Sequence, residues 1–434
     1  MNEINRKIAG LAVPAVASNI TVPLLGLCDT AVTGHLGSEA FLAAIAAGGM
    51  MLNVVFWVFG FLRMGTTGLT AEAYGASDSK GVSCVFSRGV ALALVAGLLI
   101  VAVQWPLSRL LLAVIGADGT VSPLAARYFS ICIWGAPALL VTLTLNGWFI
   151  GMQNTVWPMV VSISVNIINV ICSLVAVFGL GLGFEGVAYG TLTANWTGLV
   201  IAVVVVIRFA KGMPLWCGWD ALWHGGRLRK FFNVSVDLFL RSSCIMLVTL
   251  AVTAYGARLG ALTLAVNAVM MQFFVMFSYF MDGLAYSGEA LCGHSAGASD
   301  RLSLLRAVRA LAWWSVIVAG GFTLVYWFLS PAIVGLLTDV EGVRDGVLGM
   351  RHFLVLIPMV SAAAFLFDGF FIGLTATRRM LVTTFAAAVI FFAIIYLGPS
   401  GNPTLWTAFL AYLLARGAGL AAQMKRILDR RFER

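Results

Sequence analysis

Charged residues are scarce in this sequence. Asp, Glu, Lys and Arg together make up 10% of its 434 residues, whereas soluble globular domains carry about 25%. Hydrophobic residues account for 61% of the chain and its mean hydropathy is +0.98. No polar segment is long enough to hold a separate soluble domain. The composition therefore excludes an ordinary soluble protein and indicates a polytopic helical membrane protein.

Cysteine and histidine are also few, and neither follows a metal-binding pattern. The seven Cys residues are scattered without a CxxC pair, and the four His residues have no ligand spacing. A free Cys inside an apolar span behaves as a small hydrophobic residue. We therefore expect no structural disulfide and no zinc site. No nucleophile–base arrangement is evident either, so we do not expect an enzyme.

Long apolar runs dominate what is present. A helix needs about 20 mostly apolar residues to cross a bilayer, and we expect the first run to be retained because it is too long for a signal-peptide core. The sequence predicts twelve spans, at residues 8–33, 41–73, 86–115, 124–150, 156–180, 186–209, 230–256, 261–291, 304–336, 349–374, 379–397 and 404–424.

The positive charges are unevenly distributed over the predicted loops. The formal net charge is +9, and most of the 27 Lys and Arg residues fall at the two chain ends or in every second loop. The positive-inside rule therefore predicts that both termini are cytoplasmic. Membrane topology explains the excess of Lys and Arg over Asp and Glu, so we expect no nucleic-acid partner.

The chain contains an internal repeat. LNGWFIGMQNT at 145–155 matches FDGFFIGLTAT at 367–377, YGASD at 74–78 matches AGASD at 296–300, and HLG at 35–37 matches RLG at 258–260, in order and at a nearly constant offset. We expect two six-helix lobes, 1–215 and 216–434, joined by a linker at about 211–230. An even number of spans per copy gives parallel repeats, related by pseudo-two-fold symmetry around a central cleft. That architecture favours an alternating-access transporter, while a channel stays an alternative.

Ionisable residues lie within the predicted spans. A buried carboxyl without a partner tends to hold a proton and could couple transport to a proton gradient. Asp237 and Arg241, four residues apart on one helix face, are expected to form a structural ion pair. Cross-helix pairs such as Asp282 with Arg63, or Arg416 with Asp368, stay open. The intramembrane acids are Asp29, Asp237, Asp282, Glu289 and Asp368, and the bases are Arg63, Arg241 and Arg416.

Asp29 has no base three or four residues away, but polar residues recur at helical spacing in the fifth and sixth spans. Residues spaced in this way share one helix face, so they could form a polar pocket around Asp29. The alternative is hydrogen bonding that holds membrane helices together. The expected proton- or cation-coupling residues are Asp29, Asn169, Ser173 and Thr191.

The second copy supplies a different carboxylate. When the repeats are aligned, Asp368 falls opposite Asn146, and aromatic residues surround it in sequence. An aromatic cleft with a carboxylate would suit flat lipophilic cations, although core packing explains the aromatic residues equally well. The substrate-cleft or second-lobe candidates are Asp368, Asn146, Asp282 and Phe365.

The segments LAVP at 11–14, LCDTAVTGHLG at 27–37 and GLTAEAYGA at 68–76 resemble the multidrug and toxic compound extrusion (MATE) transporters. DLFLRSS at 237–243 and FDGFFIG at 367–373 resemble the DinF-like branch of that family. The resemblance implies secondary antiport in a bacterial inner membrane, with Asp29 as the ion-coupling residue. The family's fifth helix usually carries Asn-x-x-x-Asp, and here those positions are Asn169 and Ser173.

We therefore expect a monomeric, cofactor-free exporter of small organic, often cationic and lipophilic compounds, coupled to protons. Coupling to sodium is the nearest alternative. A lipid-precursor flippase of the related superfamily is a further alternative, disfavoured because the spans hold more acids than bases.

Overall fold

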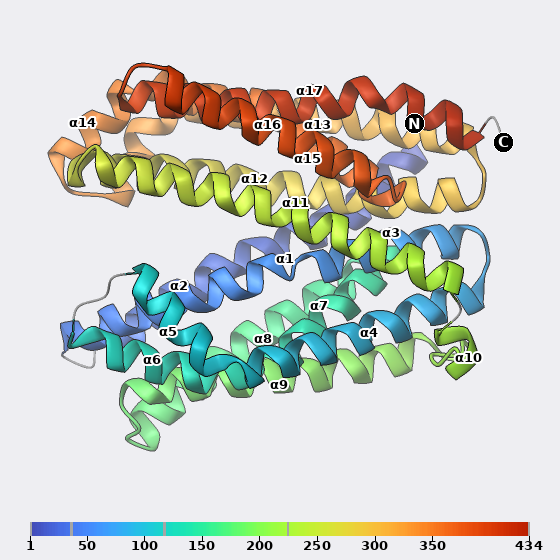
Figure 1. Ribbon diagram of the computed structural model, residues 1–434, viewed down its shortest axis with the longest axis horizontal. Coiled ribbons are helices and arrows are strands. Elements are labelled where there is room, and N and C mark those ends of the chain that lie inside the picture. Colours follow the sequence, from blue (N-terminus) through green and yellow to red (C-terminus); the bar gives the residue numbers. More distant parts are fainter. Residues whose placement is uncertain (1, 35–37, 116–118, 224, 433–434) are drawn as a thin grey trace. The chain divides into compact units, whose positions relative to one another are not determined.

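The computed structural model describes residues 2–34, 38–115, 119–223 and 225–432 (Figure 1). The side chains of several residues within these ranges, that of Asp29 among them, also lie outside the described part. The described residues form helices and their connections, without a β-strand. Among the described residues, eleven helical segments are long and apolar enough to cross a membrane by their length and composition. In addition, α1 (Asn2–Gly34) corresponds to the first predicted span. The predicted all-helical fold with twelve membrane-spanning helices is confirmed.

The described residues of the first half form ten α-helices, some of which pair to form one span. The spans after α1 are α2 (Glu39–Val58) with α3 (Phe61–Gly75), α4 (Ser79–Ala102), α6 (Val121–Cys132) with α7 (Ala136–Gly151), α8 (Val156–Leu174) and α9 (Phe184–Phe209). The shorter apolar α5 (Gln104–Ile115) follows α4, and the short α10 (Trp219–Leu222) lies in the linker.

The second half has longer, less interrupted helices. They are α11 (Gly225–Arg258), α12 (Ala261–Gly297), α13 (Arg301–Leu337), α14 (Glu341–Gly349), α15 (Arg351–Gly373), α16 (Thr377–Leu397) and α17 (Asn402–Phe432). Most predicted boundaries lie a few residues inside the observed ones because helices continue beyond their most apolar stretch.

The repeated sequence motifs adopt the same local structure in both halves. Asp78 accepts a hydrogen bond from the Gly81 N–H and caps α4, and Asp300 caps α13 through the Ser303 N–H. The residue before each cap has a positive φ, 55° at Ser77 and 56° at Ser299. A side-chain oxygen at this position satisfies a donor that the first helical turn leaves free.

The chain folds as two compact units. One, here called the N-terminal unit, comprises Ala17–Tyr74 and Asp78–Phe231; the other, the C-terminal unit, comprises Met1–Val16, Gly75–Ser77 and Phe232–Arg434. The first part of α1 thus belongs to the C-terminal unit and the remainder to the N-terminal unit. The lobe boundary at 215/216 stays a prediction.

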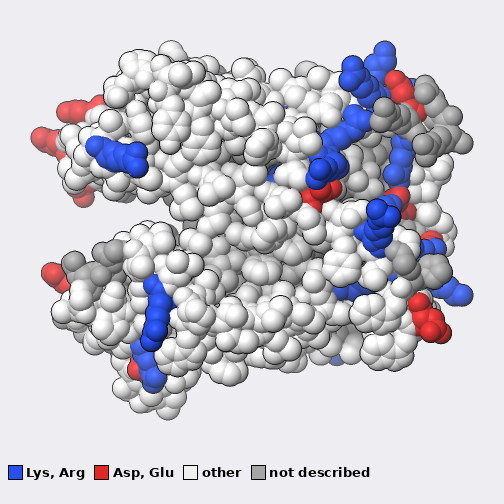
Figure 2. Space-filling view, in the orientation of Figure 1, with Lys and Arg blue, Asp and Glu red and all other residues white. Residues whose placement is uncertain are grey.

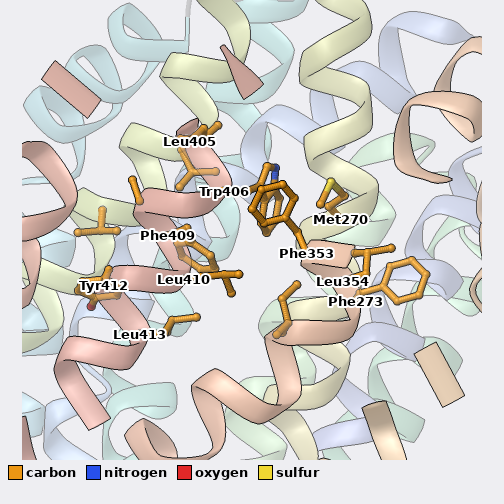
Figure 3. Close-up of a cluster of buried hydrophobic side chains, with 14 of the residues drawn as sticks. Met270, Phe273, Phe353, Leu354, Leu405, Trp406, Phe409, Leu410, Tyr412 and Leu413 are labelled. Atoms are coloured by element: carbon orange, nitrogen blue, oxygen red, sulfur yellow. The ribbon is translucent and has the colours of Figure 1, made fainter. Parts of the chain in front are cut away.

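An aromatic and aliphatic core holds α12, α13, α15 and α17 of the C-terminal unit together (Figure 3). Trp406 is fully buried, and its indole N–H donates a 2.8 Å hydrogen bond to Asn267 Oδ1. The Tyr326 hydroxyl donates to the Phe273 carbonyl over 2.7 Å. The polar tips of these large side chains are therefore satisfied inside an apolar environment.

Candidate functional site

Three charged side chains meet inside the C-terminal unit. Asp368 of α15 accepts hydrogen bonds through Oδ2 from the Nη2 groups of Arg241 on α11 and Arg416 on α17. The exposed fractions of the three residues are 6%, 3% and 4% respectively. We call Arg241, Asp368 and Arg416 the arginine–aspartate cluster. One carboxylate thus connects three helices that the sequence places far apart.

Tyr412, one helical turn before Arg416, extends this cluster. Its ring lies under the Arg416 guanidinium, 5.7 Å from the carbon Cζ to the ring centroid, and its hydroxyl accepts a 3.4 Å hydrogen bond from Nη1. Tyr412 is 1% exposed and is part of the core in Figure 3. Arg416 Nε and Asp368 Oδ1 are buried without a hydrogen-bond partner among the described residues.

The two residues of the predicted Asp237–Arg241 ion pair contact other side chains in the structure. Asp237 accepts a 3.1 Å hydrogen bond from the Thr377 hydroxyl and lies 3.3 Å from Arg378 Nη1. Residues four apart on a helix are neighbours, but both side chains also have partners on other helices. The Arg416–Asp368 contact, which the sequence left open, does form.

In the N-terminal unit, α8 and α9 carry a second buried polar group, here called the α8–α9 polar patch. Asn169 Nδ2 donates a 3.0 Å hydrogen bond to the Thr191 hydroxyl, which itself donates to the Val187 carbonyl over 3.1 Å. The Ser173 hydroxyl lies 3.5 Å from Asn169 Oδ1. Asn169 and Ser173 are 1% and 0% exposed. Three of the four predicted coupling residues therefore lie together.

Two neighbouring contacts position this patch. A Cβ added to Gly190 of α9 would lie 2.1 Å from Ser173 Oγ, so glycine permits the close approach of α8 and α9. One turn before Asn169, Asn166 Nδ2 donates a 3.2 Å hydrogen bond to the Thr21 carbonyl of α1. The fourth predicted coupling residue, Asp29, lies in α1 with its side chain outside the described residues.

The remaining predicted residues lie on separate elements. Asn146 of α7 has a buried Oδ1 without a hydrogen-bond partner among the described residues. Asp282 lies half-buried in α12. Phe365 of α15 packs against Phe274 and Phe277 of α12, with ring centroids 5.9 and 6.3 Å apart. The observed contacts of Phe365 are therefore those of a core residue, which the sequence left as the alternative to a cleft residue.

Sequence reasoning did not foresee the role of Arg88. This residue of α4 is 5% exposed, and it donates hydrogen bonds of 2.7 and 3.0 Å to the carbonyls of Ala221 and Leu222 in the linker. Ser83 and Ser87 of α4 donate to the linker carbonyls of Pro214 and Leu215. The sequence signal was weak, because an Arg near a cytoplasmic span end is ordinarily explained by topology.

Known proteins resemble this chain in sequence and in fold. The MatE family model matches residues 14–175 and 238–397. The DNA damage-inducible protein F of Escherichia coli (strain K12) is 37% identical over 96% of this chain and 91% of its own length. A probable multidrug resistance protein NorM of Thermotoga maritima is 25% identical over 71% of this chain and 66% of its own.

Solved structures show the same fold at low identity. A MATE transporter crystallised in its bent conformation superposes with a TM-score of 0.85 at 18% identity, over 99% of this chain and 97% of its own. A MOP superfamily transporter from Pyrococcus furiosus gives a TM-score of 0.84 at 18% identity, over 98% and 96%. With the twelve spans and the sequence matches, these findings show that the chain belongs to the MATE family of membrane efflux transporters.

Proposed function

We propose that this protein exports small organic compounds from the cytoplasm in exchange for protons, with Asp29 as the coupling carboxylate. The observation that carries the proposal is the α8–α9 polar patch, in which hydrogen bonds link the buried Asn169 and Ser173 and the half-buried Thr191. Ionisable and polar groups inside a membrane are costly, and they tend to mark ion or substrate pathways.

The contact between α1 and α8 supports a place for Asp29 near this patch. The Thr21 carbonyl accepts its hydrogen bond from Asn166. The first and fifth spans cross in the same direction, so equal steps along both helices lead to the same level. Asp29 lies about two turns beyond Thr21, and Ser173 lies about two turns beyond Asn166.

Protons suit this arrangement better than sodium does. Asn169, Ser173 and Thr191 offer amide and hydroxyl oxygens that carry no charge. A lone carboxyl among neutral polar groups favours its protonated form when water is excluded. Sodium coupling is the alternative, and it would need further oxygen ligands around Asp29.

The proposed direction of transport requires cytoplasmic termini in the bacterial inner membrane. In Figure 2 most of the visible Lys and Arg side chains of the C-terminal unit lie toward the end with the α12–α13 connection. Arg301 and Asp429 pair at this end over 3.4 Å, close to the C-terminus. An excess of Lys and Arg on one side supports a cytoplasmic position for that side. We propose a monomer, since each copy carries both repeats.

The test is export from proteoliposomes under an imposed pH gradient. We expect Asp29→Asn to abolish gradient-driven efflux of a lipophilic fluorescent cation, while the melting temperature stays near that of the wild type. The matched control is Asp237→Asn, an acid paired with Thr377 and Arg378, which should keep its gradient response. Efflux at wild-type rates by Asp29→Asn would remove Asp29 from the coupling mechanism.

A further inference from the structure

The arginine–aspartate cluster contains one carboxylate for two guanidiniums. Arginine keeps its proton in proteins, so the cluster by itself carries an excess positive charge. Its surroundings are apolar: Tyr412 and Leu413, both within a turn of Arg416, belong to the buried core. A single Arg–Asp pair would be enough to hold two of these helices together.

Arg416 retains an unused donor. Its Nη2 donates to Asp368 and its Nη1 to Tyr412, whereas its buried Nε has no partner among the described residues. Asp368 retains an unused acceptor, because Oδ2 receives both guanidiniums and Oδ1 receives none of the described donors. The cluster thus offers a charged donor beside a free carboxylate oxygen, both in a buried setting.

Two of the three cluster residues lie near the middle of their helices, whereas Asp368 lies five residues before the end of α15. Arg241 is close to the middle of the 34-residue helix α11, and Arg416 is close to the middle of the 31-residue helix α17. Substrate sites of secondary transporters typically lie near the bilayer midplane. A charged group at this depth is a functional candidate by default, because placing it there is costly.

We propose that the arginine–aspartate cluster is a subsite for an anionic group, a carboxylate or a phosphate, on the exported compound. Guanidinium is the side chain best suited to such oxygens. Arg416 Nε would donate to the anion, and Asp368 Oδ1 would accept from an adjacent N–H or O–H group of the same compound. The inference rests on the proposed export function and specifies its substrates, which would be anionic or zwitterionic compounds in addition to simple cations.

Binding of a matched dye pair to the full-length protein in nanodiscs tests this subsite. Rhodamine B carries a free carboxylate, and its ethyl ester has the same ring system without one. A hydrogen bond to a charged group contributes more than one between neutral groups, so we expect the acid to bind at least about tenfold more tightly than the ester. Equal affinities in the wild-type protein would overturn the proposal.

Variants of Arg416 assign the preference to the cluster. Arg416→Gln leaves Asp368 with Arg241 as a one-to-one pair and should fold. It should bring the acid-to-ester ratio to about one without changing the ester affinity, and Arg416→Lys should restore part of the preference. The control is Arg351→Gln, because Arg351 also has a buried Nε without a partner among the described residues but stacks on Trp327. It should keep the wild-type ratio. Equal loss of both dyes in Arg416→Gln would show a structural role and overturn the proposal.

A comparison of two lipid compositions identifies the source of the anion. Nanodiscs of phosphatidylglycerol, compared with phosphatidylcholine, should displace rhodamine B in an Arg416-dependent way if lipid phosphate occupies the subsite. Unchanged dye binding assigns the subsite to soluble organic anions. These measurements use no ion gradient, so their failure is distinct from a failure of proton-coupled export.

Discussion

The carboxylate of Asp368 lies between two guanidiniums from different helices. In the sequence, Asp368 has no Lys or Arg three or four residues away, which suggested a cation site in the second lobe. A carboxylate that already neutralises two cations has little attraction left for a third. The residue is therefore better understood as the anion that allows Arg241 and Arg416 to remain buried.

Removing this anion should be more damaging than removing one of its cations. Asp368→Ala leaves two like charges buried together, and we expect it to lower the free energy of unfolding by about 3–5 kcal/mol. Arg416→Gln should cost less, since one Arg–Asp pair remains. The measurement is a double-mutant cycle by chemical unfolding in detergent, with Asp368→Ala, Arg416→Gln and the double variant. Additive effects would show that the two side chains do not interact.

Asp300, which lies outside the membrane spans, should make the stability of the fold depend on pH. Its carboxylate accepts hydrogen bonds from the Ser303 hydroxyl (2.6 Å) and the Ser303 N–H (2.9 Å), and these bonds lower the pKa of Asp300 below its ordinary value. A lowered folded-state pKa stabilises the fold above the unfolded-state pKa, and this contribution is lost as the pH falls through the folded-state pKa.

We therefore expect Asp300→Ala to melt at a lower temperature than the wild type at pH 7, with the difference narrowing below about pH 4. Asp300→Asn is the control, because Asn caps a helix without titrating, and its melting difference should not narrow in this way. Melting scans across pH measure both variants. A difference for Asp300→Ala that stays constant down to acid pH would rule out the cap as the titrating contribution.

Helices and their breaks were predictable to different degrees. Apolar length was sufficient to locate all twelve spans, because the bilayer sets a minimum helix length. Breaks such as the one between α2 and α3 at Phe59–Gly60 have no comparable signal. Glycine indicates where a helix can end, but Gly320 and Gly321 lie inside α13 without ending it. Whether a helix ends at a glycine depends on packing, which a single sequence does not reveal.

The glycines of the repeated motif set how closely the helices approach. A Cβ on Gly369 of α15 would lie 2.4 Å from the Ala285 carbonyl oxygen of α12, a backbone atom. We expect Gly369→Ala to destabilise the protein by about 1–3 kcal/mol, the usual range for overpacking. Gly320→Ala is the matched control, because a Cβ there would meet no atom within 4 Å. It should be neutral or slightly stabilising, since alanine favours helix. Equal unfolding curves for both variants would contradict the tight α12–α15 packing.

For the molecule as a whole, the duplicated architecture was visible in the sequence, whereas the arrangement of its charges was only partly so. The stripe of Asn169 and Ser173, with Thr191 one span later, followed from helical spacing, and these residues do meet. Helical spacing suggested an Asp237–Arg241 pair, but spacing along one helix does not reveal competing partners on others. Arg378 and Asp368 approach from segments far along the chain. Periodicity determines which residues share a face, and tertiary packing determines what that face meets.

The choice of coupling ion concerns the whole transport cycle, and it depends on Ser173. Sodium is a hard cation that prefers several oxygen ligands, carboxylates above all. Ser173 supplies a neutral hydroxyl next to Asn169, at the position where the family resemblance leads one to expect an aspartate. We therefore predict that sodium does not stabilise the wild-type protein, and that Ser173→Asp creates sodium binding that requires Asp29.

The measurement is the melting temperature in sodium against choline at fixed pH and ionic strength. Ser173→Asp should melt several degrees higher in sodium, and the gain should vanish when Asp29→Asn is added. Ser173→Asn is the control for size, because α8 and α9 approach closely at Gly190 and Asn has about the size of Asp without its charge. If the wild-type protein were already stabilised by sodium, and Asp29→Asn removed that effect, the coupling ion would be sodium. The hydroxyl of Ser173 would then act as a ligand, and proton coupling would have to be abandoned.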